Sequence, residues 1–452
     1  MGKHRVVEEL ANPRGTRLTG TRIAFLFLVC MACQIPLILG TGFLPVKVLL
    51  ERVFAPPKLF PDLANHCQSA KPIMASEFHE RQRRLASALL HLNASAYIAE
   101  PGASAQYFGN ISTASWKLSE RPLLLIITPR LVNDSQVEAK VSILTPRFEA
   151  TRAKTLPIPF EGVEYIEWRE EESPYEIAAS ALSIEGTVYL DDAARLFVFN
   201  GFQKSLPHAE VAPSPAKIKE IWQRKSVAEI ELLKCANEAT LLAIRAVHKK
   251  MNLGMKESEV SKMLSIALQA AGLDNGGCLT LFGENAALPH GSGSDRALGK
   301  SDFALFDCVG HLHGYFSDVT RTVALPETRI PAENRAIWGD VLFAQTVASR
   351  VAVAGAITQD VDASARTFLE LTGRGAYFTH RLGHGIGLEG HEEPYLRGGS
   401  LDVIQTGHTC SNEPGIYIEG KVSCVYSTAV MSGLNGRFVQ KGGRPIGGLL
   451  LY

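Results

Sequence analysis

The chain has 452 residues, which is enough for two domains of ordinary size and an extension. Acidic and basic residues balance at 46 each, so the charge excludes the strongly basic surfaces that bind nucleic acid or another polyanion. Hydrophobic residues make up 46% of the chain and charged residues 20%, the composition of a globular protein with a sizeable core.

The first element in chain order is an apolar run close to the N-terminus. Residues 23–46 carry no charge, and a basic leader, residues 1–22, precedes them. A membrane-spanning helix needs roughly 20 apolar residues, and basic residues gather on its cytosolic side. The run therefore predicts a transmembrane signal-anchor that leaves the rest of the chain lumenal or extracellular. A signal peptide that is cleaved on secretion remains the alternative, whereas the basic leader disfavours a buried core helix.

Sequons and cysteines add little to this prediction. Three N-x-S sequons, at Asn93, Asn110 and Asn133, agree with a glycoprotein in the secretory pathway. The eight cysteines are scattered. Cys30 and Cys33 form a C-x-x-C pair inside the apolar run, where no redox or zinc role is expected. The other six show no paired spacing, and we interpret them mostly as small buried residues, with a disulfide left open.

Alternating strands and helices predict a first α/β domain over residues 71–212, after a linker at 47–70. A helix is predicted at 77–92, and strands are predicted at 123–128, 137–144 and 187–192.

The stretch PSPAKIKE marks the start of a second domain, residues 213–421. Two amphipathic helices open it. The first, at 226–251, begins with Ser226 as N-cap and Glu229 in the capping-box position. The second, at 257–273, ends at Gly272.

Hard metal ligands are concentrated after these helices. Asp307 and Asp318 lie on two predicted strands that a glycine-containing turn can fold into a hairpin, which would bring the carboxylates side by side. Two adjacent carboxylates repel each other and raise a pKa unless a cation lies between them. For either aspartate alone, a solvent-exposed position at a strand end is the alternative.

Histidines and a glutamate extend the candidate set. His380, His384 and His391 lie close together in one glycine-containing stretch, Glu413 precedes Pro-Gly, and His290 lies in ALPHGSG. A structural histidine or a surface loop would explain each of them separately. Together, carboxylates and an imidazole suit Mn²⁺, Zn²⁺ or Co²⁺. A carboxylate-rich set can hold two ions that share a hydroxide and polarise a carbonyl, so the pattern indicates a hydrolase.

In their order and spacing, these residues resemble the creatinase/aminopeptidase P/prolidase group of metallopeptidases (M24B-like), which includes fungal Xaa-Pro peptidases. The phrase GYFSDVTRT, around Asp318, matches the second-Asp motif of that group. The resemblance covers residues 75–421. It implies an α/β fold class: a creatinase-like N-terminal α/β domain, which helps to form a homodimer, followed by a pita-bread α+β catalytic domain.

The resemblance also implies roles for the candidate residues. Two divalent ions, most naturally Mn²⁺, are bound by Asp307, Asp318, His384 and Glu413. The implied reaction is hydrolysis of an Xaa-Pro bond in a proline-containing peptide, with Glu413 moving a proton to the leaving nitrogen. His290 and His391 would stabilise the oxyanion or the new amine, and His380 would contact the substrate.

The chain departs from the family pattern after EPGIYIEG. The family has a strand there whose Glu bridges both ions, two residues after an Arg. In this chain Ser427 and Val425 stand at those positions. Lys-Val-Ser at 421–423 can be encoded by a splice-donor consensus, so residues 422–452 could be translated intron in a faulty gene model.

Two further alternatives stay open. Without the fifth ligand, the chain could be a catalytically impaired, membrane-tethered binding protein of the same fold. It could also be a creatinase-like amidinohydrolase, although that branch works without metal and the intact ligands argue against it.

Overall fold

The computed structural model describes residues 59–64, 66–133, 136–182, 185–291 and 293–420, together with the backbone of three strands at 422–425, 429–432 and 438–439. These residues belong to one compact unit that starts at Leu59. The predicted leader and apolar run, residues 1–46, lie outside the described part. Among the helices that are described, none has the length and apolar character needed to cross a bilayer.

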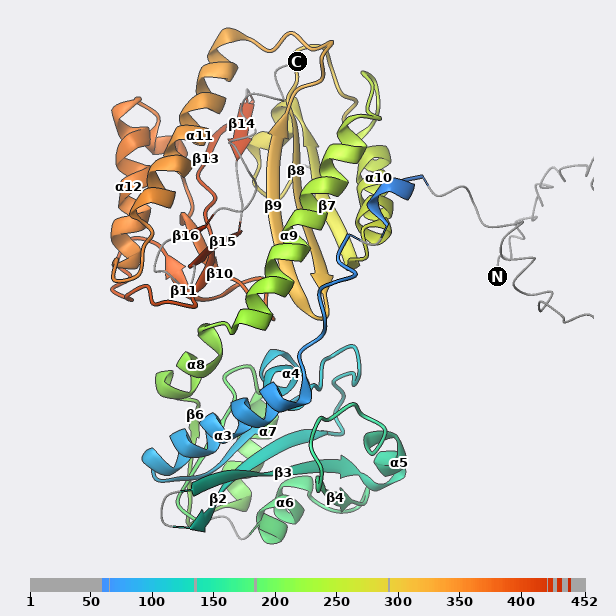
Figure 1. Cartoon of the computed structure of the whole chain (residues 1–452), viewed down its shortest axis with the longest axis vertical. Helices are drawn as coiled ribbons and strands as arrows, with labels where there is room; N and C mark the ends of the chain where they lie inside the picture. The colour runs from blue at the N-terminus through green and yellow to red at the C-terminus, as the bar shows by residue number, and fades with distance from the viewer. Residues whose placement is uncertain are drawn as a thin grey trace, which may run out of the picture. The chain divides into compact units, whose positions relative to one another are not determined.

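The first half of the described chain is built on a six-stranded mixed sheet in the order β4-β3-β2-β1-β5-β6 (Figure 1). Strand β1 pairs antiparallel with β2 and parallel with β5, which in turn pairs parallel with β6. The strands are β1 (Ala94–Ala99), β2 (Leu124–Asn133), β3 (Gln136–Pro146), β4 (Glu164–Trp168), β5 (Thr187–Leu190) and β6 (Glu210–Pro213). The helices are α3 (Ala75–His91), α4 (Ala103–Gly109), α5 (Ala150–Ala153), α6 (Pro174–Leu182), α7 (Leu196–Ser205) and α8 (Ala216–Gln223).

Both faces of this sheet are buried, which explains the unbroken apolar run at the start of β2. Leu125 and Ile127 pack in the same core as Leu85 of α3. Leu124 and Ile126 alternate with them along the strand and pack with residues of α6 and α7 in a separate core. A strand covered on both faces is apolar throughout rather than alternating.

The second half opens with two helices that lie against a three-stranded antiparallel sheet, β7-β8-β9 (Figure 1). These elements are α9 (Val227–His248), α10 (Glu257–Ala270), β7 (Asp274–Phe282), β8 (Ala304–Leu312) and β9 (Tyr315–Val323). The predicted capping box is present: Ser226 Oγ accepts from the Glu229 backbone N–H at 3.2 Å, and the Glu229 carboxylate accepts from the Ser226 N–H at 2.9 Å. The predicted stop at Gly272 is also present, since this residue has φ 89°.

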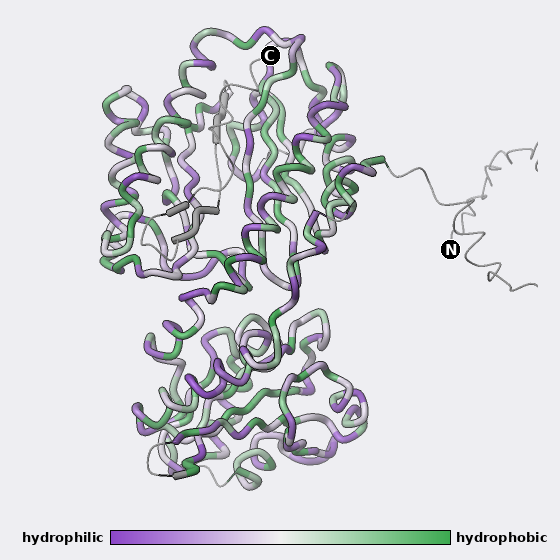
Figure 2. Tube along the Cα trace, in the orientation of Figure 1, coloured by the Kyte–Doolittle hydropathy of each residue, from purple (hydrophilic) through white to green (hydrophobic). Residues whose placement is uncertain are grey.

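The last part adds two helices and short strands. They are α11 (Ala332–Val351), α12 (Thr358–Leu371), β10 (Gly383–Gly385), β11 (Glu392–Leu396), β12 (Thr409–Ser411), β13 (Gly415–Ile418), β14 (Val422–Val425), β15 (Ala429–Ser432) and β16 (Phe438–Val439). Five of the strands form a sheet in the order β11-β10-β12-β15-β16, and β13 pairs with β14. Apolar and polar residues alternate along α11 and α12 in Figure 2, as expected of helices with one buried face.

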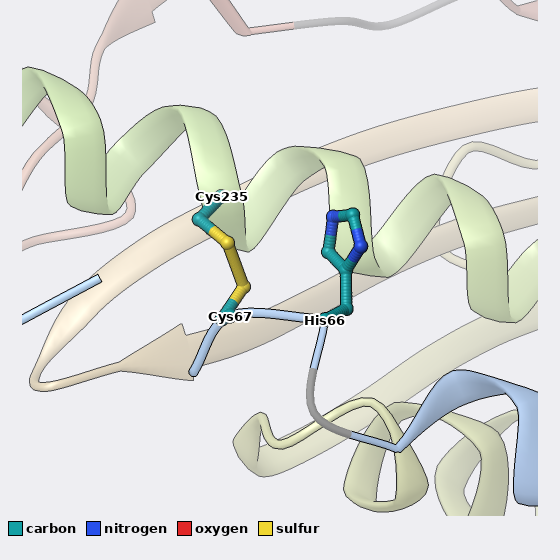
Figure 3. Close-up of side chains that lie close together, drawn as sticks. All are labelled: His66, Cys67 and Cys235. Carbon is teal, nitrogen blue, oxygen red and sulfur yellow. A yellow bond between two sulfur atoms is a disulfide. The ribbon is translucent and has the colours of Figure 1, made fainter. Parts of the chain in front are cut away.

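The cysteines correct one prediction. Cys67 is disulfide-bonded to Cys235 of α9, and Cys278 of β7 is bonded to Cys308, directly opposite on β8 (Figure 3 shows the first pair). Interpreting these four as small buried thiols was therefore wrong, because cysteine spacing does not reveal pairing that is set by the tertiary fold. Cys410 is a buried free thiol, in agreement with the prediction.

Candidate metal centre

One cavity of about 800 Å³ collects the residues that the sequence singles out. It is enclosed by the β7–β9 sheet, the loop before β10 and the segment around β13. All seven predicted site residues line it: His290, Asp307, Asp318, His380, His384, His391 and Glu413. The structure thus brings together side chains that are spread over more than a hundred residues of sequence.

The β8–β9 hairpin positions the two aspartates. Its two-residue turn, His313 and Gly314, has positive φ at both positions, which suits the twist of paired antiparallel strands. In the register of the hairpin, Asp307 lies opposite Thr320 and Asp318 lies opposite Val309, so the two carboxylates are diagonal neighbours on one face. Thr320 Oγ1 also donates a hydrogen bond of 3.0 Å to Asp307 Oδ1, which orients that carboxylate.

His384, on β10, points its ring into the carboxylates. Its Nε2 lies 2.8 Å from Glu413 Oε1 and 3.3 Å from Asp318 Oδ2. Its Nδ1 lies 2.9 Å from the carbonyl oxygen of Gly385, a contact that fixes the ring and leaves Nε2 toward the cavity.

Glycines let β10 pass this close to its neighbours. A Cβ on Gly383 would lie 2.1 Å from the carbonyl oxygen of Ser411, and one on Gly385 would lie 2.5 Å from that of Glu393. Glu413 follows β12, where its backbone N–H donates to the Leu382 carbonyl at 2.8 Å and its carboxylate accepts from Ser411 Oγ. The glycines therefore set the distance between His384 and Glu413.

The electrostatics of the cavity favour a bound cation. Burial, together with the charges of Asp318 and Glu413, raises the pKa of Asp307 to about 7. Burial alone would lower the pKa of His384, but hydrogen bonds and charge from Asp318 and Glu413 outweigh it and raise that pKa to about 10. Burial likewise opposes ionisation of Glu413, whose pKa the His384 ring nevertheless lowers. Three carboxylates therefore converge on one imidazole, which leaves an excess of negative charge.

The donor set fits a divalent metal. Ligand atoms of Asp318, His384 and Glu413 lie within 4.8 Å of one another, and Asp307 adds a fourth hard donor at the same cavity. The position of the expected fifth ligand, Ser427, lies outside the described residues.

A second group of metal-type side chains lies elsewhere, at His66, Cys67 and Cys235. In Figure 3 the imidazole lies beside the sulfur–sulfur bond. Because both sulfurs belong to a disulfide, neither is a thiolate that could bind an ion.

The remaining histidines surround the centre. The His391 ring centroid lies 4.1 Å from that of His384, and burial and the His384 charge lower the pKa of His391. His380 Nε2 lies 2.8 Å from the hydroxyl of Tyr417, a cavity residue that sequence reasoning missed. Tyr417 could have been found by counting along the strand in twos from Glu413, since side chains alternate. His290 is exposed at the mouth of the cavity.

Comparisons with known proteins identify the family. The model of metallopeptidase family M24 matches residues 231–436. An uncharacterized peptidase of Schizosaccharomyces pombe is 34% identical over 431 residues, which cover 93% of this chain and 94% of that protein. The chain therefore belongs to metallopeptidase family M24, in agreement with the resemblance seen in the sequence. The family match runs to residue 436 and so extends beyond Lys421, the predicted end of the resemblance.

Solved structures confirm the pita-bread fold. The dipeptidase PepE of Mycobacterium ulcerans superposes with a TM-score of 0.75 at 25% identity, covering 83% of this chain and 98% of that one. A prolidase from Thermococcus sibiricus gives a TM-score of 0.70 at 26% identity, covering 80% and 96%. The chain is thus similar to dipeptidases and prolidases over nearly their whole length.

Proposed function

We propose that this protein is a metal-dependent peptidase that hydrolyses Xaa-Pro bonds near the N-terminus of peptides. The observation that carries the proposal is the convergence of four candidate metal ligands and three further histidines on one cavity. Similarity to a dipeptidase and a prolidase supports it.

The residues present define what each would do. Asp307, Asp318, His384 and Glu413 would hold two divalent ions, most naturally Mn²⁺, with Zn²⁺ or Co²⁺ as alternatives. Once bound, such ions supply Lewis acidity and a nucleophilic hydroxide at neutral pH.

Side chains of the cavity would transfer the proton, stabilise the oxyanion and contact the substrate. The Glu413 carboxylate accepts a proton from the nucleophile and delivers it to the leaving proline nitrogen. The His391 ring lines the cavity beside His384, where its imidazole can donate an N–H to the developing oxyanion. His290 lines the same mouth and would assist it. His380, which Tyr417 holds by a hydrogen bond, would contact the substrate.

The deciding experiment is turnover of a proline peptide series by the full chain with added Mn²⁺, Zn²⁺ or Co²⁺. We expect metal-dependent release of Xaa from Xaa-Pro peptides, no release from Xaa-Ala counterparts, and no activity in His384→Ala. His208→Ala, at an exposed histidine outside the cavity, serves as the matched control. Extending the peptides from two to five residues separates a dipeptidase from an aminopeptidase. Binding of metal without any turnover would contradict the proposal.

Ser427 favours a second candidate, a catalytically impaired binding protein of the same fold. It rests on the absence of the family's bridging Glu from the sequence. Sequencing the transcript across codons 421–423 tests whether the departure is real: a transcript that encodes VSCVYSTAV leaves an altered site, and one that encodes a different tail identifies a translated intron.

We also propose that the catalytic part lies in the lumen or outside the cell, anchored by residues 23–46. The two disulfides support this location, because structural disulfides persist in oxidising compartments. Asn93, the asparagine of the first sequon, is exposed and therefore accessible to glycosylation. Protease protection in microsomes, glycosidase digestion and N-terminal mapping of the mature protein would separate an anchored form from a secreted one, and analytical ultracentrifugation would test for a homodimer.

A further inference from the structure

A second cavity, of about 380 Å³, lies beside His391. Strands β1, β5 and β6 run parallel, and Glu100, Asp191 and Ser214, which follow their carboxyl ends, form one wall of it. The crevice at the carboxyl ends of parallel strands is where α/β sheets commonly bind ligands. His391 lines both this cavity and the metal cavity, so the two meet at one side chain.

Carboxylates dominate this second cavity, which we call the acidic crevice. Those that line it are Glu100, Asp191, Asp192, Glu389, Glu392 and Glu393. Arg195, Lys219 and Lys225 form ion pairs with Glu100, Asp192 and Glu392, respectively. Asp191, Glu389 and Glu393 have no ion-pair partner within the described ranges, so the crevice carries a surplus of negative charge.

One of these carboxylates, Glu389, lacks a donor among the described residues, and a second, Glu392, is paired through one oxygen only. Glu389 is half-buried, its carboxylate has no hydrogen bond or ion pair to any described residue, and burial together with Asp191 raises its pKa. The side chain of Glu392 is fully buried; Lys225 Nζ donates to Oε1, whereas Oε2 receives no hydrogen bond. The Glu392 oxygen is shielded from solvent, whereas the half-buried Glu389 carboxylate lines the crevice, so a donor from outside the chain can pair with Glu389.

The other walls of the crevice suit an extended aliphatic chain. Trp222, Tyr395 and Leu118 line it and are only partly covered by the protein. Long cationic side chains lie along apolar surface with their charged ends at polar groups, and aromatic faces attract such cations.

We propose that the acidic crevice is a substrate subsite that accepts a cationic group of the peptide. Glu389 is the carboxylate that it contacts, and the aromatic wall packs against its methylene chain. This inference rests on the proposed peptidase function and adds the substrate class, peptides with a lysine or arginine or with a free N-terminal ammonium close to the scissile bond. The two sources share the same chemistry, and the experiment separates them.

The test measures equilibrium binding by calorimetry, with the full metal-loaded chain. The ligands are Xaa-Pro-Ala peptides whose scissile amide is replaced by an uncharged ketomethylene, so that turnover does not interfere. Xaa is lysine or norleucine, each with a free or an acetylated N-terminus. We expect the lysine peptides to bind about tenfold more tightly than the norleucine peptides. Glu389→Gln should reduce the preference to less than about twofold, and Glu138→Gln, an exposed carboxylate on β3, should leave it unchanged.

Each outcome decides the proposal. If acetylation, rather than the change to norleucine, removes the Glu389-dependent affinity, the N-terminal ammonium is the cation. Equal affinities for all four peptides, a preference that survives Glu389→Gln, or no binding of any peptide would overturn the subsite. A charge preference in a chain that hydrolyses nothing would retain the subsite and reject the proposed reaction, whereas hydrolysis without a charge preference would reject the subsite alone.

Discussion

In the metal-free protein, the imidazole of His384 forms ion pairs with the carboxylates of both Asp318 and Glu413. Those carboxylates raise its pKa to about 10, so the ring is protonated at neutral pH in the metal-free protein. Asp307, with a pKa of about 7, is partly protonated there as well. Both groups must lose their protons to bind a metal.

Metal affinity should therefore rise with pH. For each proton that must leave on binding, the apparent metal affinity increases about tenfold per unit rise in pH, as long as the pH is below the pKa of that group. For Mn²⁺, we expect the apparent Kd to fall by at least about tenfold between about pH 6 and 7, as the His384 proton becomes easier to remove. Calorimetry in buffers of different ionisation enthalpy would count the protons that are released. A Kd that stays constant over this range would contradict the arrangement.

Ser427 provides a gain-of-function test. If the family's bridging Glu belongs at this position, Ser427→Glu should tighten the binding of the two ions, so that more metal stays bound per chain, and should increase any Xaa-Pro turnover. Ser423→Glu, on β14, adds the same charge at a neighbouring position and should change neither. Metal analysis by mass spectrometry on desalted protein gives the count. Equal metal content in the two variants would argue against the assignment of Ser427.

At the residue scale, the sequence predicted which residues belong to the site, but not which side chains they contact. The order of Asp307, Asp318, His384 and Glu413 sufficed to predict one centre, because each lies in a short segment with a recognisable pattern. Tyr417 and the Thr320 hydrogen bond to Asp307 were not predicted as parts of the site, since they depend on which strand faces which. The acidic crevice was also missed, because Asp191 and Glu389 come from distant segments.

At the scale of single elements, α9 is the helix whose start the sequence predicts best. Ser226 both caps the helix and donates to Glu77 of α3 at 2.7 Å. We expect Ser226→Ala to lower the free energy of unfolding by about 1 kcal/mol, because a backbone N–H loses its acceptor. Urea unfolding followed by circular dichroism measures this change. Ser87→Ala, inside α3, removes a hydroxyl that caps no helix and should cost less; equal losses would show that the cap contributes nothing.

Short strands were harder to predict than this helix. Helix α9 has caps and many periods of apolar spacing, so local signals suffice. Strands β10 and β12 have three residues each, too few to show a period of two, and they are strands because they pair with each other and with β11 and β15 in the folded sheet. The same reason hides the disulfide between Cys278 and Cys308, whose positions face each other only once β7 and β8 are in register.

At the scale of the whole molecule, a buried charged cluster joins the first half of the described chain to the second. Arg81 of α3 contacts Glu229 of α9 at 3.3 Å and the hydroxyl of Tyr315 on β9 at 3.3 Å. Its side chain is only 3% exposed and that of Glu229 only 2%, so solvent does not screen the pair.

Arg81→Leu should destabilise the protein strongly, because it leaves the Glu229 charge buried without its partner. We expect a loss of about 3–5 kcal/mol in the free energy of unfolding. Arg83→Leu is the matched control: this arginine lies on the same helix, is exposed and pairs with Glu80, so it should cost no more than about 1 kcal/mol. Chemical denaturation of both variants gives the comparison. Similar losses for the two would mean that the buried cluster does not hold the halves together.

The chain order of the metal ligands has a consequence for biosynthesis. Asp307 and Asp318 share one hairpin that can form once residue 323 has left the ribosome, because its contacts are local. His384 and Glu413 follow much later and reach the hairpin only through β10 and β12. On the ribosome the nascent chain thus exposes two carboxylates without their imidazole, a weak and unselective chelator. We therefore expect the ion of the proposed centre to be selected after translation, by the metal pool of the compartment where folding finishes.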